Sequence, residues 1–282
     1  MNNFEAIVSL NLIPQIGSVR LECLLNSFQK PSEIFKASRK DLVAAVGEHL
    51  GESVISFDIR RLENDLALAK KLGLKIITLF DQDYPQALQE IPGRPIVLYV
   101  LGDINAQDNL AIGIVGSRRA SLYGLSSAER FAGELSVRGI TIVSGMARGV
   151  DTYAHRGALR AKGRTIAVMG SGFNHIYPAE NVDLAKEISA SGAVISEFPV
   201  DTKPLAQNFP RRNRLISGLS LGVLITEAAK NSGALITADF ALEQGREVQF
   251  MSQEENKRIA ESGDSPLEYL QILKGVLDPV AV

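Results

Sequence analysis

The sequence of 282 residues contains no tryptophan, one cysteine and three histidines. A single cysteine, Cys23, excludes an internal disulfide. One cysteine and three histidines also supply few ligands for a transition metal, and we therefore expect no bound metal. The chain also lacks an uncharged apolar run of about 18 residues, the length that a membrane helix requires. Its N-terminus has no basic segment followed by an apolar one. We therefore expect a cytoplasmic protein without a membrane partner.

Several nucleotide-binding and catalytic motifs are absent as well. No GxxxxGK[ST] segment occurs, which excludes a phosphate-binding loop of that kind. Proteins that bind NAD on such a sheet have a GxGxxG turn after the first strand. Here that turn has Gly116 but no further glycine until Gly124, so we expect no NAD and no other cofactor. Ser144, Asp151 and His155 have the residue types of a hydrolase triad. Asp151 and His155 are only one helical turn apart, however, and no nucleophile elbow surrounds the serine. We interpret Asp151 instead as a residue that accepts backbone N–H groups at a helix start.

The composition is that of a soluble globular protein, with 45% hydrophobic and 22% charged residues and a formal net charge of −2. A chain of this length favours two domains. We predict a helical, helix-hairpin-helix-like domain over residues 1–65. Residues 66–105 form a linker and sheet extension, with strands at 75–79 and 96–100. Residues 106–282 form a Rossmann-like core.

The N-terminal segment Pro14-Gln15-Ile16-Gly17-Ser18 lies between two apolar helical stretches. It resembles the turn of a helix-hairpin-helix motif, in which the N–H groups of the second helix can hold a DNA phosphate. A degenerate second copy surrounds Gly47. The alternative is a small helical domain that packs against the core and binds no DNA, and the sequence leaves both open.

From residue 111 onward, short apolar runs alternate with helical stretches of ten to fifteen residues. This alternation predicts an α/β fold, a doubly wound and mostly parallel sheet. Each strand ends in a small or polar turn, and the carboxyl ends of parallel strands meet at one edge, so these turns converge. The predicted strands are 112–115, 141–143, 165–168, 193–196, 223–225 and 248–250.

The turn after the first core strand, in AIGIVGSRR at 111–119, predicts an anion site. Gly116 allows close backbone approach, the start of the next helix presents free N–H groups, and Arg118 and Arg119 add positive charge. Arg148, in the turn after the second strand, is expected nearby. The glycine at 170 after the third strand is typical of a close-approach turn.

The segment NFPRRNRLISGLS, at 208–220, places Phe209 beside several cations, an arrangement that suits stacking of unpaired bases with phosphate pairing. A solvated charge run is the alternative, and Arg214 has a further one, an internal pair with Glu197 or Glu227. Ser232 and Gly233 begin another helix and form a further anion site or serve tight packing.

Six segments in order resemble the DprA/Smf family of DNA-processing proteins: IVGSRR, IVSGMARGVDTYAHRGAL, TIAVMGSGFNHIYPAEN, SEFP, FPRRNRLISGLS and EAAKNSGALITADFALEQGREV. The match covers roughly residues 75–250, and the shared order of the motifs makes it highly specific. The helical N-terminus is similar to a variable domain that some members carry. In place of a Pro-Gly turn after the last strand, this chain has the polar VQFMSQEEN.

The resemblance implies an extended Rossmann-like domain that binds single-stranded DNA without cutting it, and therefore no enzyme. It implies a role in natural transformation or recombination, loading of the RecA recombinase and a homodimer, with single-stranded DNA-binding protein as a further candidate partner. Arginines and turn amides would contact phosphates, and Phe209 would stack on a base. The predicted DNA-binding residues are Gly116, Ser117, Arg118, Arg119, Ser144, Gly145, Arg148, Gly170, Phe209, Arg211, Arg212, Asn213, Arg214, Ser232 and Gly233.

Two other functions compete with DNA binding. Nucleotide phosphoribohydrolases have a similar layout of strands and turns, but they use a PGGxGTxxE turn with a catalytic glutamate, which ITEAAKNSGALITAD lacks. A scaffold that binds another protein through its N-terminal helices would show no effect of DNA.

Overall fold

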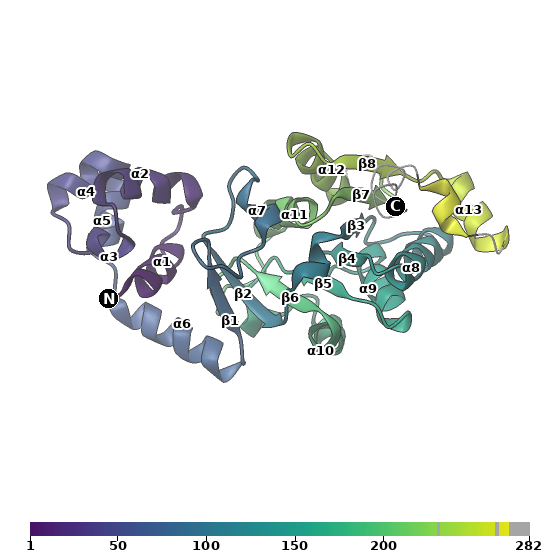
Figure 1. Ribbon diagram of the computed structural model, residues 1–282, viewed down its shortest axis with the longest axis horizontal. Coiled ribbons are helices and arrows are strands. Elements are labelled where there is room, and N and C mark those ends of the chain that lie inside the picture. The colour runs from purple at the N-terminus through teal and green to yellow at the C-terminus, as the bar shows by residue number, and fades with distance from the viewer. Residues whose placement is uncertain (230–231, 263–264, 271–282) are drawn as a thin grey trace.

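The computed structural model describes residues 1–229, 232–262 and 265–270 (Figure 1). Helices at the N-terminus are followed by an α/β unit built on one sheet. The helices are α1 (Asn3–Asn11), α2 (Ser18–Phe28), α3 (Pro31–Ile34), α4 (Arg39–Val46), α5 (Glu48–Ile55), α6 (Ile59–Lys71), α7 (Gln86–Gln89), α8 (Leu122–Val137), α9 (Val150–Arg160), α10 (Val182–Ser191), α11 (Asn208–Gly218), α12 (Gly233–Glu243) and α13 (Gln253–Ser262). The 3₁₀ helices are η1 (Ala106–Asn109), η2 (Phe173–His175), η3 (Ala179–Asn181) and η4 (Pro266–Tyr269).

Within the described residues, the strands form one eight-stranded sheet in the order β1-β2-β6-β5-β4-β3-β7-β8. Pairs β1–β2 and β2–β6 are antiparallel, and the remaining neighbours are parallel. The predicted α/β class and mostly parallel sheet are thus confirmed, and a strand occurs at every predicted place. The strands are β1 (Lys75–Thr78), β2 (Val97–Gly102), β3 (Ala111–Val115), β4 (Thr141–Ser144), β5 (Thr165–Val168), β6 (Ala193–Ser196), β7 (Gly222–Ile225) and β8 (Glu247–Phe250).

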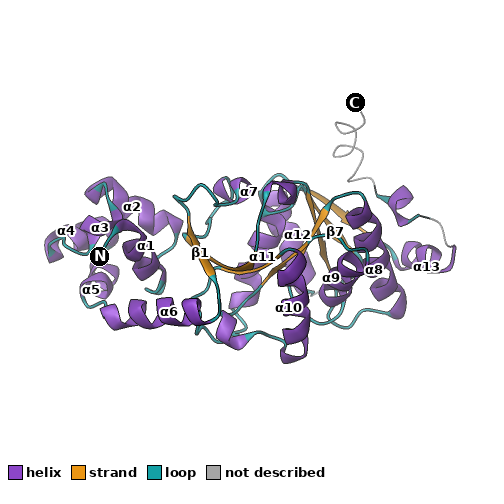
Figure 2. Ribbon diagram, turned by 60° about the horizontal axis from the view of Figure 1, so that its bottom comes forward, coloured by secondary structure: helices purple, strands orange, loops and turns teal. Residues whose placement is uncertain are grey.

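Both faces of the sheet are covered, which explains the continuous apolar runs of its central strands. Ile112 and Ile114 on β3 join a core cluster with Phe131 of α8, whereas Ala111 and Val115 join a second cluster. Successive side chains of a strand point to opposite faces, so one short run supplies both clusters. Helices α8, α9 and α10 lie on one side of the sheet, and α11 and α12 on the other (Figures 1 and 2).

The order of the strands creates a switch point between β3 and β7. The chain steps from β3 through β4 and β5 to β6, then crosses back to β7 and continues outward to β8. Because such crossovers are right-handed, the change of direction puts the later helices on the opposite face. The connections that leave the carboxyl ends of β3 and β7 therefore turn to opposite faces of the sheet, and a ligand crevice is expected between them.

The N-terminal helices form the end of the molecule beside β1, as the helical prediction for this region implied (Figure 1). The α6 helix runs through the boundary expected after residue 65, and β1 and β2 belong to the main sheet. Asp65 on α6 accepts hydrogen bonds from the Tyr99 hydroxyl (2.6 Å) and the Val200 N–H (2.9 Å). These buried bonds join the helical region to the sheet. No helix in the described part of the chain combines the length and apolarity needed to span a bilayer.

His155 on α9 should make folding stability depend on pH. The side chain is fully buried, its Nδ1 lies 2.7 Å from Thr165 Oγ1, and burial lowers its pKa from 6.5 to about 3. In the unfolded chain the His155 imidazole takes up a proton near pH 6.5, whereas in the folded chain it stays neutral down to about pH 3. The contribution of His155 to the free energy of unfolding is therefore fully present above pH 6.5 and is lost as the pH falls toward 3, at up to about 1.4 kcal/mol per pH unit.

Urea unfolding at about pH 7.5 and about pH 5 should show a loss of roughly 2 kcal/mol from this residue. The His155→Gln variant should lack that part of the pH dependence. Burial raises the pKa of Asp151, which acts with the opposite sign, but Asp151 titrates in both proteins and cancels in the comparison. Parallel pH curves for the two proteins would show that His155 carries no such linkage.

Candidate nucleic-acid interface

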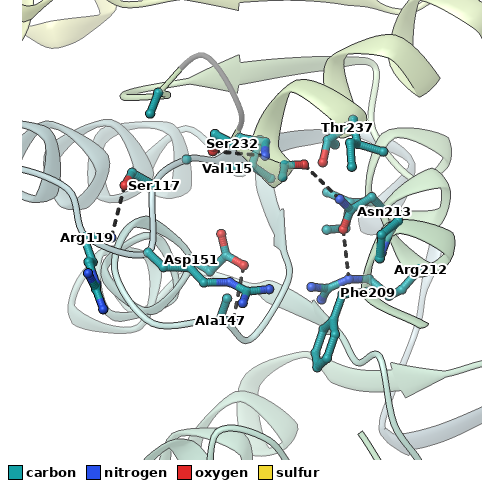
Figure 3. A pocket seen from close by; sticks show the side chains of 18 of the residues that line it. Val115, Ser117, Arg119, Ala147, Asp151, Phe209, Arg212, Asn213, Ser232 and Thr237 are labelled. Carbon is teal, nitrogen blue, oxygen red and sulfur yellow. Dashed lines mark hydrogen bonds between the residues drawn. The ribbon is translucent and has the colours of Figure 1, made fainter. Parts of the chain in front are cut away.

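A cavity of about 650 Å³ opens at the carboxyl ends of β3 and β7, at the switch point (Figure 3). The turn after β3, the start of α11 and the loop that leads into α12 enclose it. The fold thus brings together side chains that are more than 100 residues apart in the chain. The predicted site residues that line it are Gly116, Ser117, Arg118, Arg119, Phe209, Arg212, Asn213, Ser232 and Gly233.

The turn after β3 is fixed by Glu227, which follows β7. The Ser117 N–H donates to the Glu227 carbonyl (2.7 Å), and the Ser121 hydroxyl donates to its carboxylate (2.6 Å). Ser121 also caps α8 by accepting a hydrogen bond from the Gly124 N–H (3.1 Å). The N–H groups at this helix start were expected to be free for a ligand, but those of Ser121 and Gly124 already donate to the Glu227 carboxylate and to the Ser121 hydroxyl. An internal carboxylate already occupies the helix start, so a ligand anion depends on the arginines of the turn.

Arg212 forms the cationic floor of the cavity. Its side chain is buried, its Nη1 donates to the Val168 carbonyl, and its Nε donates to Asn213 Oδ1 (3.2 Å). Burial lowers the pKa of Arg212 to about 10 and the charge of Asp151 opposes this shift, so the group stays protonated at neutral pH. A Cβ at Gly145 would lie 2.5 Å from the guanidinium and from the Asp151 carboxylate. The lack of a side chain at Gly145 therefore leaves the space that these two groups occupy.

Phe209 stands at the rim of the cavity beside Arg118. The Arg118 Cζ lies 5.4 Å from the centroid of the Phe209 ring, within cation–π range. A Cβ at Gly170 would lie 2.8 Å from Phe209 Cδ1, so only glycine allows the ring to pack there. Gly170 thus positions the aromatic side chain and does not line the cavity itself.

The start of α12 closes the other side of the cavity. The Ser232 hydroxyl accepts a hydrogen bond from the Ala234 N–H (3.3 Å), and Asn213 Nδ2 donates to the Gly233 carbonyl (3.1 Å). Thr237, one turn later, also lines the cavity (Figure 3). Asn231 of the predicted NSG motif lies outside the described residues.

Arg214 lies away from the cavity, and its alternative role is the one observed. The guanidinium forms a two-pronged pair with Glu197, with both N–O distances 2.7 Å, and donates to the Gly93 carbonyl. Arg211 is 3.5 Å from the same carboxylate and is more than half exposed. We therefore correct the expected phosphate contact of Arg214, because its charge is buried and neutralised by Glu197.

Ser144 and Arg148 also lie outside the cavity lining. The Ser144 hydroxyl is buried and donates to the Ile114 carbonyl (2.6 Å). His155 contacts Thr165, so these side chains form no hydrogen-bonded relay of the hydrolase type. Arg148 is exposed and its guanidinium is paired with Glu180, with one N–O distance of 2.7 Å.

Three carboxylates shape the site, and the sequence analysis assigned none of them to it. Asp151 was interpreted only as a helix-start residue, yet it lines the cavity opposite Arg212. Glu227 and Glu180 hold the turn after β3 and Arg148, respectively. The one available signal for Glu227 was its place directly after a strand at the converging edge. Among the described residues, no group of His, Cys, Asp and Glu side chains is suited to hold a metal ion.

The predicted helix-hairpin-helix turn borders a separate cavity of about 460 Å³ between the N-terminal helices and the sheet. Gly17 is the N-cap of α2 and supplies no side-chain hydrogen bond. Arg20 and Arg94 line the same cavity, and Arg94 is paired with Glu22 at 3.0 Å. DNA contact by this turn stays a prediction.

An open, mostly parallel sheet with a cavity at its switch point defines the Rossmann-like class of fold, and arginines line this cavity. Residues 75–267 match the family model of DNA recombination-mediator protein A. The chain belongs to this family, and the resemblance to DprA/Smf proteins is confirmed.

The relatives extend this assignment. Protein Smf of Escherichia coli is 45% identical over 195 residues, which is 69% of this chain and 52% of that protein. The chain therefore spans about half the length of this relative. The DNA processing protein A of Streptococcus pneumoniae has a similar structure, with a TM-score of 0.75, 27% identity and coverage of 94% and 95% of the two chains. For DNA processing protein A of Helicobacter pylori, whose structure concerns its binding of single-stranded DNA, the TM-score is 0.60 at 28% identity, covering 74% and 98%.

Proposed function

We propose that this protein binds single-stranded DNA in the cavity between β3 and β7 and does not cut it. The observation that carries the proposal is the meeting of Arg118, the buried Arg212 and Phe209 around one cavity. Cations and an aromatic ring together are what an unpaired strand requires, since its phosphates are charged and its bases stack. The single-stranded DNA binding described for the Helicobacter pylori relative supports the same use of this fold.

The binding site is cationic although the chain is not. The formal net charge of −2 gives no general attraction to nucleic acid. Glu197 and Glu180 neutralise arginines outside the cavity, whereas Arg118 and Arg119 of the lining have no ion pair recorded among the described residues. The local excess of positive charge should direct phosphates to this cavity.

Equilibrium binding of a fluorescently labelled oligo-dT across a salt series tests the proposal. Each neutralised phosphate releases condensed counterion, with a log–log slope of about −0.7 per contact for single strands. Contacts from Arg118, Arg119 and Arg212 should give a slope of roughly −2. Absence of binding by the folded wild type at low salt would disprove the function.

By the same proposal, the protein helps to load RecA during DNA uptake or recombination and acts as a homodimer, with single-stranded DNA-binding protein as a further partner. A recombinase-loading assay on coated single strands tests this step after DNA binding is established.

The alternative function is cleavage of a nucleoside monophosphate. Asp151, the carboxylate of the described lining, is held by the Ala147 N–H and faces Arg212, so we expect no free base to be released from AMP. Sustained release would favour the enzyme instead.

Freeing Arg148 should strengthen DNA binding. The Glu180 carboxylate raises the pKa of Arg148 well above its usual range, and both side chains are exposed. Exposed ion pairs are weak, so a phosphate can compete for this guanidinium. We expect Glu180→Gln to raise affinity for oligo-dT roughly two- to fivefold and to steepen the salt dependence. The matched control is Asp183→Asn, which removes an exposed carboxylate paired with Lys186. Equal affinity of both variants and wild type would place Arg148 off the DNA path.

A further inference from the structure

The Phe209 ring has little free surface for a base. The side chain is half-buried, Gly170 packs directly against it, and the Arg118 guanidinium lies over the ring. A base stacked on Phe209 alone must share the ring with Arg118. The site therefore calls for a more accessible aromatic surface if it is to hold successive bases.

Tyr177 provides such a surface next to Phe209. The two ring centroids are 5.7 Å apart, with the planes tilted by 57°. The Tyr177 side chain is exposed, at 41% of its full accessible area, and it does not line the 650 Å³ cavity. It lies just outside the rim, where Phe209 supports it through a tilted aromatic contact.

The turn that carries Tyr177 is tied to its surroundings. The Ser171 hydroxyl donates to the His175 carbonyl (2.7 Å), and the Asn174 N–H donates to the Val200 carbonyl (3.0 Å). On the far side of Tyr177, Asn181 Nδ2 donates to the Met146 carbonyl (2.9 Å). A ring held by such a turn loses little freedom when a ligand stacks on it.

A cation accompanies this ring. The Arg148 guanidinium is exposed and is paired with Glu180, which follows Tyr177 by three residues, so the cation is tied to the same turn. An exposed aromatic ring with an adjacent exposed arginine is suited to one nucleotide, with the base on the ring and the phosphate on the cation.

We propose that Tyr177 forms a second nucleobase-stacking position, next to the nucleotide held by Phe209 and Arg118, with Arg148 on the intervening backbone. This inference rests on the proposed binding of single-stranded DNA. The ligand class is an unpaired nucleobase of either type, since stacking discriminates weakly between bases. The DNA path thus leaves the cavity over α9 and the turn before η3.

Binding measurements separate stacking from phosphate contact. Tyr177→Ala should weaken binding of oligo-dT roughly 5- to 100-fold and leave the salt slope unchanged, because no phosphate contact is lost. Tyr177→Phe should bind like wild type. Phe80→Ala removes another exposed aromatic ring, in the loop after β1, and should have no effect. An abasic oligodeoxyribose phosphate of the same length should bind wild type and Tyr177→Ala equally.

The absence of tryptophan in the chain permits a direct readout. Tyr177→Trp introduces the single tryptophan of the chain at the proposed position, where it can be excited apart from the five remaining tyrosines, and stacking on a base should quench its emission. Oligo-dT should quench this variant, the abasic oligomer should not, and Phe80→Trp should respond to neither.

Each outcome bears on a different claim. Wild-type affinity of Tyr177→Ala for oligo-dT, or an unquenched Tyr177→Trp with bound oligo-dT, overturns the stacking position alone. An equal loss on the abasic oligomer also overturns it, since Tyr177 would then act by supporting Phe209 and Arg118. Failure of the wild type to bind oligo-dT removes the proposed function and the stacking position together.

Discussion

Replacing Arg118 by alanine is expected to weaken single-stranded DNA binding roughly 10- to 100-fold, the range for a lost charge-assisted hydrogen bond. The residue lines the cavity and contacts the Phe209 ring, and no carboxylate in the described part of the chain forms an ion pair with it that a phosphate would have to displace. The loss should be similar for all sequences, because a phosphate contact carries no base information. The salt slope should become shallower by about 0.7.

The control is Arg138→Ala, at the opposite end of α8, where the guanidinium donates to the Glu134 carbonyl. Arg138→Ala changes the net charge by the same amount as Arg118→Ala, but its affinity for single-stranded DNA should stay close to that of the wild type. Fluorescence anisotropy of labelled oligo-dT and of a mixed-sequence strand measures both variants. Wild-type affinity of Arg118→Ala at moderate salt would mean that the cavity is not the DNA site.

Replacing Arg214 by methionine is expected to lower the free energy of unfolding by about 3–5 kcal/mol, the usual cost of breaking a buried ion pair by removing one partner. The Arg214 side chain is 11% exposed and that of Glu197 only 4%. Removing the arginine also leaves the Gly93 carbonyl without these donors. Urea unfolding of both proteins measures the loss.

Arg211→Met is the matched control for this substitution. Arg211 is 55% exposed and 3.5 Å from the same carboxylate, so we expect a loss of less than about 1 kcal/mol. Under conditions where Arg214→Met remains folded, its affinity for oligo-dT should stay within about twofold of wild type, in contrast to Arg118→Ala. A strong loss of DNA binding without loss of stability would return Arg214 to the interface.

The sheet was predictable because its signals are local. Buried runs such as 112–115 and 165–168 can hardly form anything except central strands between helical segments, and the structure has β3 and β5 there. The site was partly predictable for a topological reason, since carboxyl ends of parallel strands meet at one edge. This rule places the turn at Gly116 and the segment at Phe209 around one cavity.

The direction of each arginine was not predictable. Successive residues of α11 turn by about 100°, so its arginines cannot all face the cavity, and the rotation of the helix about its axis decides which of them do. Arg212 turns inward beside Asp151, whereas Arg214 meets Glu197. The sequence left Glu197 and Glu227 as equal candidates for Arg214. They lie at the ends of different strands, and only the order of strands in the sheet assigns Glu227 to the turn after β3.

The sequence by itself thus determined the strands, the helices between them, the edge of the sheet where the polar turns meet and the family. The tertiary structure alone decided which charges remain available there. Local patterns report burial and turn geometry, which neighbouring residues create. Whether an arginine meets a carboxylate or open space depends on side chains from distant segments, as with Arg148 and Glu180. The contact between the rings of Tyr177 and Phe209 depends on distant segments in the same way.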